Sequence, residues 1–268
     1  MVIGKAAIIG GGAMAEALIK GMRHAGKLAD ASWLTVSDPS AARREVLAKL
    51  YGVQTTADNK AAVAGAKWIL LAVKPQVAAG VLEELAKAMP PSTVAASIMA
   101  GWSVAQLQQL LPNRPVIRIM PNTPLSVGAG MSAIVMTDDV PKEIGEEIEA
   151  AFAASGETVR VPESWMDAIT GLSGSGPGFL FAILDAMSDA GVAAGLPRNV
   201  AVRLAAQTMM GAGKMAVESG IHPAMLRDQV TSPGGTTIAG VLAMEAAGVR
   251  TAMHAAVAAA AERSRQLR

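Results

Sequence analysis

The segment AAIIGGGAMAEALIKGMRH, residues 6–24, is the part of this sequence that says most about its fold. Four small or apolar residues meet three glycines, and apolar side chains then recur at helical spacing. This order predicts a buried strand, a tight turn and a helix, as at the start of a dinucleotide-binding domain. Gly10, Gly12 and Ala15 form the pattern G-x-G-x-x-A, in which Gly10 permits the turn, Gly12 lets a pyrophosphate approach and Ala15 lets helix and strand pack. A tight turn without a ligand is the alternative.

Apolar runs and helical patterns continue to alternate after this first unit. A second strand is predicted over residues 33–36 and a helix over 40–50. Further strand candidates cover residues 67–73, 93–98, 115–119, 133–136 and 158–161. Because these runs are apolar almost throughout, they predict a parallel sheet of six to eight strands with helices on both faces.

Beyond Pro162 the strand-like runs disappear and only helical patterns remain. These patterns cover residues 166–172, 179–191, 198–219, 223–230 and 237–267, the last with an interruption near Gly248. The sequence therefore predicts an α/β fold in two domains. Residues 1–162 form a Rossmann-type domain with a parallel sheet, and residues 163–268 form an all-helical domain.

Composition excludes several classes of function. The 268 residues include 23 basic and 22 acidic side chains, a net charge of +1, so no surface for nucleic acid is expected. The absence of cysteine excludes disulfides, thiol nucleophiles and cysteine-ligated metals. His24, His222 and His254 lack the spacing of metal ligands, so no metal site is predicted.

The hydrophobic fraction of 51% raises the question of a membrane protein. Charged residues interrupt the most apolar stretch, residues 239–261, so no run reaches the roughly 18 apolar residues of a spanning helix. The start of the chain lacks the basic region of a signal peptide, and we therefore predict a cytoplasmic protein. Abundant small residues with only 3% aromatics indicate a large subunit interface, with a general alanine bias as the alternative.

The end of the second predicted strand carries two opposing signals for the choice of cofactor. Asp38 is suited to the ribose hydroxyl of NAD, whereas Ser37 with Arg43 and Arg44 is suited to the 2′-phosphate of NADP. Asp38 is also suited to capping the helix that begins near Ser40, and arginines on helices are commonly solvated. The residues alone leave NADPH and NADH both open.

A second glycine cluster, VTSPGGTT at residues 230–237, precedes the last predicted helix. Its proline and glycines leave backbone N–H groups and hydroxyls free to converge beyond the helix end. Such a nest is suited to a carboxylate, while ordinary capping by Ser232 or Thr236 is the alternative reading.

Five segments together resemble the pyrroline-5-carboxylate reductase family, and the match runs essentially end to end. They are GGGAMAEAL (10–18), LAVKPQ (71–76), RIMPNTP (118–124), TGLSGSGP (170–177) and VTSPGGTT (230–237). The resemblance implies an NADPH-dependent oxidoreductase, with NADH less often used, that reduces 1-pyrroline-5-carboxylate to L-proline in the last step of proline biosynthesis. It also implies substrate binding and dimerisation through the helical domain, and assembly into rings such as decamers.

The same resemblance implies roles for individual residues. The pyrophosphate would lie at Gly10, Gly12, Ala13 and Met14, and the adenine ribose at Ser37, Asp38 and Asn59. The path to the nicotinamide would be lined by Ala72, Val73, Lys74, Pro75, Ala100, Asn122, Thr123 and Pro124. The substrate would be held by Ser232, Gly235, Thr236 and Thr237, with residues 173–177 beside it. The chain departs from the family pattern at Met99, Trp102 and Gly178.

Reduction of a cyclic imine needs little from protein acids and bases, because the cofactor supplies the hydride. The hypothesis is that the hydroxyl of Thr237 bonds the ring nitrogen as it becomes an amine. Another imine or β-hydroxyacid reductase of the same plan is the first alternative, and would depend on Lys214 as an acid. A non-catalytic nicotinamide-binding regulator is the second.

Overall fold

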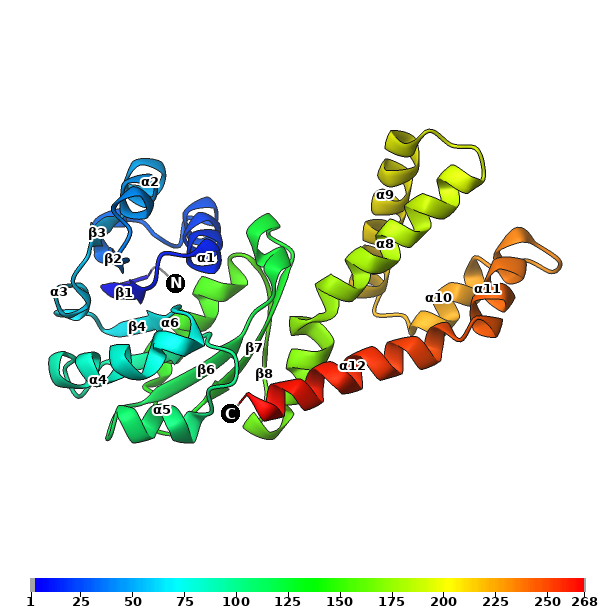
Figure 1. The fold of residues 1–268 in the computed structure, drawn as a ribbon. Coiled ribbons are helices and arrows are strands. Elements are labelled where there is room, and N and C mark those ends of the chain that lie inside the picture. Colours follow the sequence, from blue (N-terminus) through cyan, green and yellow to red (C-terminus); the bar gives the residue numbers. More distant parts are fainter. Residues whose placement is uncertain (1–2, 268) are drawn as a thin grey trace. The chain divides into compact units, whose positions relative to one another are not determined.

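A computed structural model describes residues 3–267 of the chain (Figure 1). These residues form two compact units. The first comprises the chain up to Ser175 together with the residues from Ala260 onwards, and the second comprises Gly176–Ala259. The chain therefore leaves the first unit once and returns to it with its C-terminal turns.

The first unit is built on an eight-stranded sheet in the order β3-β2-β1-β4-β5-β6-β7-β8. The strands are β1 (Ala6–Ile9), β2 (Leu34–Ser37), β3 (Gln54–Thr56), β4 (Trp68–Leu71), β5 (Val94–Ser97), β6 (Val116–Met120), β7 (Gly130–Met136) and β8 (Gly156–Arg160). Strand β1 lies between β2 and β4 and pairs in parallel with both. The order of the first six strands is that of a dinucleotide-binding sheet, which confirms the predicted Rossmann-type fold.

The sheet differs from the prediction at two strands. Strand β7 runs antiparallel to β6, with Met120 opposite Ala133, so the sheet is not parallel throughout. A parallel crossover needs about a dozen residues or more, whereas residues 121–129 form a shorter connection containing a 3-10 turn at Thr123–Val127. The sequence pattern does not predict β3, because Gln54–Thr56 is short and polar.

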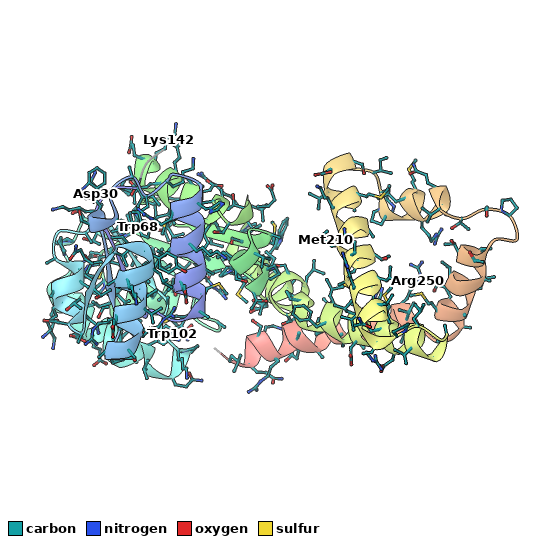
Figure 2. All side chains as sticks on the ribbon, turned by 90° about the horizontal axis from the view of Figure 1, so that it is seen from above. Asp30, Trp68, Trp102, Lys142, Met210 and Arg250 are labelled. Atoms are coloured by element: carbon teal, nitrogen blue, oxygen red, sulfur yellow. The ribbon has the colours of Figure 1, made fainter. Side chains whose placement is uncertain are left out.

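Successive residues of the buried strands point to opposite faces of the sheet, and both faces are covered. Ile8 belongs to the hydrophobic cluster on one face and Ile9 to the cluster on the other. The first face packs against α1 (Ala13–His24), α2 (Ala41–Tyr51) and α6 (Lys142–Ala153), and the second against α3 (Asn59–Val63), α4 (Ala78–Ala88), α5 (Val104–Leu110) and α7 (Met166–Ile169). Trp68 of β4 is fully buried (Figure 2), and its indole N–H donates to the Glu147 carboxylate at 2.8 Å.

The second unit is entirely helical in the part of the chain the structure describes. Its helices are α8 (Gly176–Ala193), α9 (Arg198–Ser219), α10 (Pro223–Gln229), α11 (Thr236–Ala246) and the first part of α12 (Val249–Gln266). Gly248, at φ +78°, separates the last two helices at the predicted interruption. Within residues 3–267 no helix is both long and apolar enough to cross a membrane.

The helices of the second unit bury few of their own side chains in the single chain. Only Ser188 is buried on α8, and only Ala201 and Ala205 on α9. Large apolar side chains remain exposed, such as Met210 on α9 (Figure 2). Exposed apolar surface of this extent is typical of an interaction face.

Candidate active site

The glycine turn between β1 and α1 brings the chain close to the end of β4. Gly10 has φ +100°, and a Cβ there would lie 2.7 Å from the Ala72 carbonyl oxygen, so only glycine fits. At Gly12 a Cβ would meet open space, and no side chain caps the start of α1. The first N–H groups of this helix are therefore available to an anion, as a dinucleotide pyrophosphate requires.

A cavity of about 250 Å³ opens where β1, β4, β5 and β6 end. Five of the predicted cofactor residues line this cavity, together with four further residues. The cavity is lined by Met14, Ala72, Val73, Pro75, Ile98, Met99, Ala100, Met120 and Pro121. No charged residue is among them, so the cavity is suited to a flat, largely apolar ring. It lies at the carboxyl ends of the strands, where open α/β sheets bind their ligands.

Three of the lining residues were not predicted from the sequence, namely Ile98, Met120 and Pro121. Each directly follows or ends a strand, and that position is the signal that could have found them. Met99, noted in the sequence as a departure close to the nicotinamide pocket, lines the cavity. Trp102 packs against the hydrophobic cluster on the second face of the sheet.

The remaining residues of the predicted nicotinamide path lie outside the cavity lining. Lys74 is exposed just before the turn at Pro75. The Asn122 amide donates to the Ser173 carbonyl at 3.1 Å and accepts from the Met131 N–H at 2.9 Å. Asn122 therefore ties the end of β6 to the segment before α8. Thr123 and Pro124 begin the 3-10 turn that follows.

That segment before α8 contains a π-helical turn over Thr170–Gly174, within the TGLSGSGP motif. The Ser175 N–H donates to the Thr170 carbonyl at 2.8 Å and closes the turn. A Cβ at Gly174 would lie 2.6 Å from the terminal carbon of Met120, which lines the cavity. The wide turn and the missing side chain thus let the motif approach the cavity wall, and π-helical turns are frequent at functional sites.

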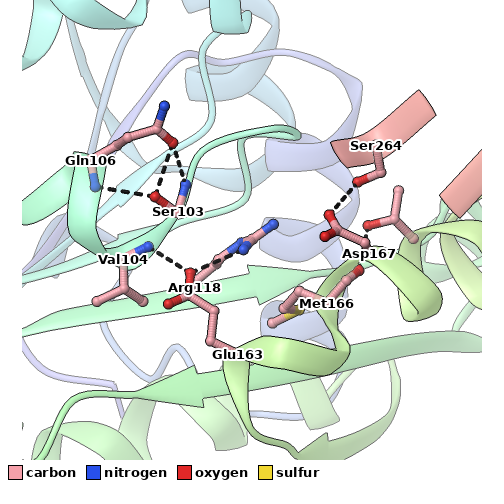
Figure 3. Close-up of polar contacts among 9 residues, drawn as sticks. Ser103, Val104, Gln106, Arg118, Glu163, Met166, Asp167 and Ser264 are labelled. Atoms are coloured by element: carbon pink, nitrogen blue, oxygen red, sulfur yellow. Dashed lines mark hydrogen bonds and ion pairs between the residues drawn. The ribbon is translucent and has the colours of Figure 1, made fainter. Parts of the chain in front are cut away.

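The loop between β5 and α5 supplies three residues of the cavity wall, and a polar network fixes its far end (Figure 3). Ser103 and Gln106 cap each other at the start of α5. The Glu163 carboxylate accepts from the Val104 N–H at 2.7 Å and from the buried Arg118 at 3.0 Å. The start of α5 is therefore tied to β6, the strand that ends at the cavity.

The last turn of α12 joins the same region. Ser264 donates to the buried Asp167 carboxylate at 2.9 Å (Figure 3). Gly101 has φ +80°, and a Cβ there would lie 2.9 Å from the Leu267 carbonyl oxygen. The C-terminal turn therefore packs directly on the loop that lines the cavity, a contact that no local sequence pattern indicates.

At the end of β2, two of the predicted ribose residues bond to each other. The Ser37 side chain is buried, and its hydroxyl donates to the Asn59 carbonyl oxygen at 2.7 Å. The Asn59 amide donates in turn to Glu84 at 3.1 Å. Asp38 is half-buried and accepts from the Gly11 N–H at 2.9 Å. Asp38 thus lies beside the glycine turn, while the Ser37 hydroxyl is turned into the protein.

The two arginines of α2 make different contacts. The Arg43 guanidinium donates to the carbonyls of Gly11 and Gly12 and pairs with Glu16. The Arg44 guanidinium donates to the Asp38 carbonyl at 2.7 Å. The hydrogen bond from Arg43 holds the pKa of the Glu16 carboxyl below its ordinary value. Glu16 therefore lies beside the glycine turn, at a position that no sequence motif indicates.

The four predicted substrate residues lie together in the second unit, at the start of α11. Gly235 precedes the helix, and a Cβ there would lie 2.3 Å from the Ser232 hydroxyl oxygen. Thr236 and Thr237 are the first residues of the helix, their side chains are exposed, and no side chain caps the helix end. The segment therefore offers free N–H groups and hydroxyls to an anion.

Lys214, which a hydroxyacid reductase would use as an acid, and His222 make polar contacts within or at the end of their own helices. Lys214 on α9 is exposed and lies 3.6 Å from Glu218 on the same helix. His222 caps α10 by accepting from the Ala224 N–H. Among residues 3–267 no group of three or more histidines, aspartates and glutamates is arranged to hold a metal ion.

The strand order of the sheet and the uncapped start of α1 place this chain among proteins that bind a dinucleotide at the carboxyl ends of the strands. Two family models match the chain in agreement with this class. Residues 5–101 match "NADP oxidoreductase coenzyme F420-dependent", and residues 163–267 match "Pyrroline-5-carboxylate reductase dimerisation".

Full-length relatives narrow the class to one family. The pyrroline-5-carboxylate reductase of Synechocystis sp. is 46% identical over 260 residues, which cover 97% of each chain. The solved structure of the enzyme from Coxiella burnetii is 32% identical, covers 98% of each chain and gives a TM-score of 0.92. The Plasmodium falciparum enzyme, solved with NADP bound, is 28% identical with a TM-score of 0.87, covering 98% of this chain and 97% of that one. The chain belongs to the pyrroline-5-carboxylate reductase family.

Proposed function

We propose that the chain reduces the C=N bond of 1-pyrroline-5-carboxylate to give L-proline, with NADPH or NADH as the hydride donor. The observation that carries this function is the end-to-end match to pyrroline-5-carboxylate reductases, 46% identical to that of Synechocystis sp.. This reaction is the last step of proline biosynthesis.

The chain's own residues fit the cofactor in both of its halves. The uncapped N–H groups that follow Gly12, at Ala13 and Met14, would hold the pyrophosphate. Asp38 would face the adenine ribose, with Ser37 and Asn59 supporting it from within the protein. The nicotinamide would lie in the apolar cavity, along the path formed by Ala72, Val73, Lys74, Pro75, Ala100, Asn122, Thr123 and Pro124. When bound there, the cofactor supplies the hydride.

The segment at the start of α11 would hold the substrate. Its N–H groups and hydroxyls, from Ser232, Gly235, Thr236 and Thr237, would bind the carboxylate. The Thr237 hydroxyl would bond the ring nitrogen as it becomes an amine. A threonine hydroxyl is too weak an acid to be the proton source, so the proton on the nitrogen comes from solvent or is already carried by the protonated substrate. Holding the carboxylate fixes the orientation of the ring, which is most of what this reaction asks of the protein.

We propose that the functional boundary between cofactor and substrate halves lies between residues 162 and 163. The dimerisation model begins at residue 163, which supports this position. The exposed apolar side chains of α8, α9 and α11 would be covered by a second copy, and dimers would assemble further into a ring such as a decamer. We further propose that the enzyme acts in the cytoplasm.

The transfer of hydrogen itself tests the reaction. The protein is incubated with 1-pyrroline-5-carboxylate and NADPH carrying deuterium on the transferred position of nicotinamide C4. We expect proline with one deuterium on the carbon of the former C=N bond, detected by mass spectrometry. Proline without deuterium, or no proline, would contradict the proposed reaction.

A further inference from the structure

Arg43 reaches from α2 across to the glycine turn. Its Nε donates to the Gly11 carbonyl and one terminal nitrogen to the Gly12 carbonyl at 3.3 Å. The same terminal nitrogen lies 2.5 Å from the Glu16 carboxylate. Arginine is suited to such a position because its planar guanidinium presents several donors in fixed directions.

Glu16 is itself held in place, which fixes the direction of Arg43. The Tyr51 hydroxyl, from the last residue of α2, donates to the second Glu16 oxygen at 3.0 Å. The side chains of Arg43 and Glu16 are only about a quarter exposed, at 25% and 28%. Glu16 also neutralises the arginine charge, so the guanidinium serves the loop chiefly through its geometry.

The peptide groups of Gly11 are thus held from both sides. Its N–H donates a hydrogen bond to the Asp38 carboxylate, and its carbonyl accepts one from the Arg43 guanidinium. A glycine-rich segment is otherwise the most flexible kind of backbone, and ordering it on binding would weaken the affinity. With both groups held, the turn is already ordered before a pyrophosphate arrives.

We propose that Arg43 is a positioning residue of the glycine turn, which acts on the pyrophosphate common to NADPH and NADH and does not bind the 2′-phosphate. The inference rests on the proposed function, because it requires the turn to hold a dinucleotide. The neighbouring Arg44 contrasts with it, since the Arg44 guanidinium lies at the Asp38 and Pro39 carbonyls, where the ribose is expected.

Comparing the affinities for NADPH and NADH distinguishes a residue that positions the glycine turn from one that binds the 2′-phosphate. Titration of NADPH and NADH, followed by their fluorescence, is compared for the wild type, Arg43→Ala and Arg43→Lys. We expect Arg43→Ala to raise the Kd of both cofactors by a similar factor, about 5- to 20-fold, with kcat at saturating cofactor within about twofold. Arg43→Lys keeps the charge but presents its donors from a single nitrogen, without the planar fork of the guanidinium, so its Kd values should lie between those of the wild type and of Arg43→Ala.

Matched variants make the result specific. Lys49→Ala removes one exposed charge from the same helix and should leave both Kd values unchanged. Glu16→Gln removes the charge that directs Arg43, and should raise both Kd values in parallel by less than Arg43→Ala. It also tests the inference should Arg43→Ala fail to fold.

Three results would overturn the inference. A rise in Kd for NADPH alone would make Arg43 a ligand of the 2′-phosphate. If Arg43→Ala lowered the Tm but left the Kd values of both cofactors unchanged, the role of Arg43 would be purely structural. If neither the Kd values nor the Tm changed, Arg43 would have no role in the glycine turn. A wild-type protein that binds neither cofactor would instead overturn the proposed function.

Discussion

Thr237 is the side chain whose hydroxyl the proposed chemistry uses directly. We expect Thr237→Ala to lower kcat by roughly 10- to 1000-fold, the range for losing one well-placed polar contact in a transition state. Thr237→Ser keeps the hydroxyl and should retain most of the activity. Steady-state kinetics with saturating cofactor measure both variants, and an unchanged kcat in Thr237→Ala would remove this residue from the mechanism.

Asp38 decides how well the site tolerates a 2′-phosphate. Asp38→Asn keeps an oxygen to accept from the Gly11 N–H but removes the charge that opposes a phosphate. We therefore expect the ratio of kcat/KM for NADPH to that for NADH to rise by about tenfold, since one like-charge contact shifts binding by roughly that factor. A ratio that stays constant or falls would show that Asp38 does not face the ribose.

At the scale of single residues, the sequence predicts the backbone part of the site better than its side-chain contacts. Motif and strand position together indicate Gly10, Gly12 and Ala72, because turn geometry depends on nearby sequence. The buried Ser37 hydroxyl and the return of Arg43 to the glycine turn depend on partners 22 and 32 residues away. No local pattern encodes such contacts.

The glycine turn is the element on which cofactor binding depends. Substitution of its two outer glycines, Gly10 and Gly12, should have different effects on stability. Gly10→Ala forces a Cβ against the Ala72 carbonyl at φ +100°, which should cost about 1–3 kcal/mol in backbone strain alone. Gly12→Ala places its Cβ in open space and should change the free energy of unfolding by no more than about 0.5 kcal/mol.

Although Gly12→Ala should have little effect on stability, it should weaken cofactor binding. Its added methyl group occupies the space through which the pyrophosphate approaches, so Gly12→Ala should fold normally and bind cofactor poorly. Chemical denaturation and fluorescence titration measure the two effects separately. A Gly12→Ala protein with wild-type affinity would contradict the proposed position of the pyrophosphate.

The bounds of helices and strands can be predicted where the apolar pattern is strong. The direction of a strand in the sheet cannot be predicted from that pattern. The predicted β1 range coincides with the observed Ala6–Ile9, and the predicted helix over 198–219 coincides with α9. The reversal of β7 follows from the length of its connection to β6, and the apolar run at 133–136 is the same for either direction. The π-helical turn at Thr170–Gly174 likewise has no signature in the spacing of apolar residues.

At the level of the whole molecule, the exposed apolar side chains of the helical unit and its match to a dimerisation family indicate self-association. Phe181 on α8 is 63% exposed in the single chain, and a charge in a buried interface is strongly unfavourable. We expect Phe181→Glu to lower the mass of the assembly in light scattering, whereas Leu50→Glu, at an equally exposed position on α2, should not. An unchanged mass for Phe181→Glu would exclude the α8 face from the interface.

Steady-state turnover shows whether this protein makes proline from 1-pyrroline-5-carboxylate. Oxidation of NADPH and, separately, NADH is followed with racemic 1-pyrroline-5-carboxylate as substrate, and proline is quantified. We expect substrate-dependent oxidation with one proline formed per reduced cofactor consumed. A folded protein that binds the cofactor but oxidises neither form with this substrate would rule out the proposed reaction.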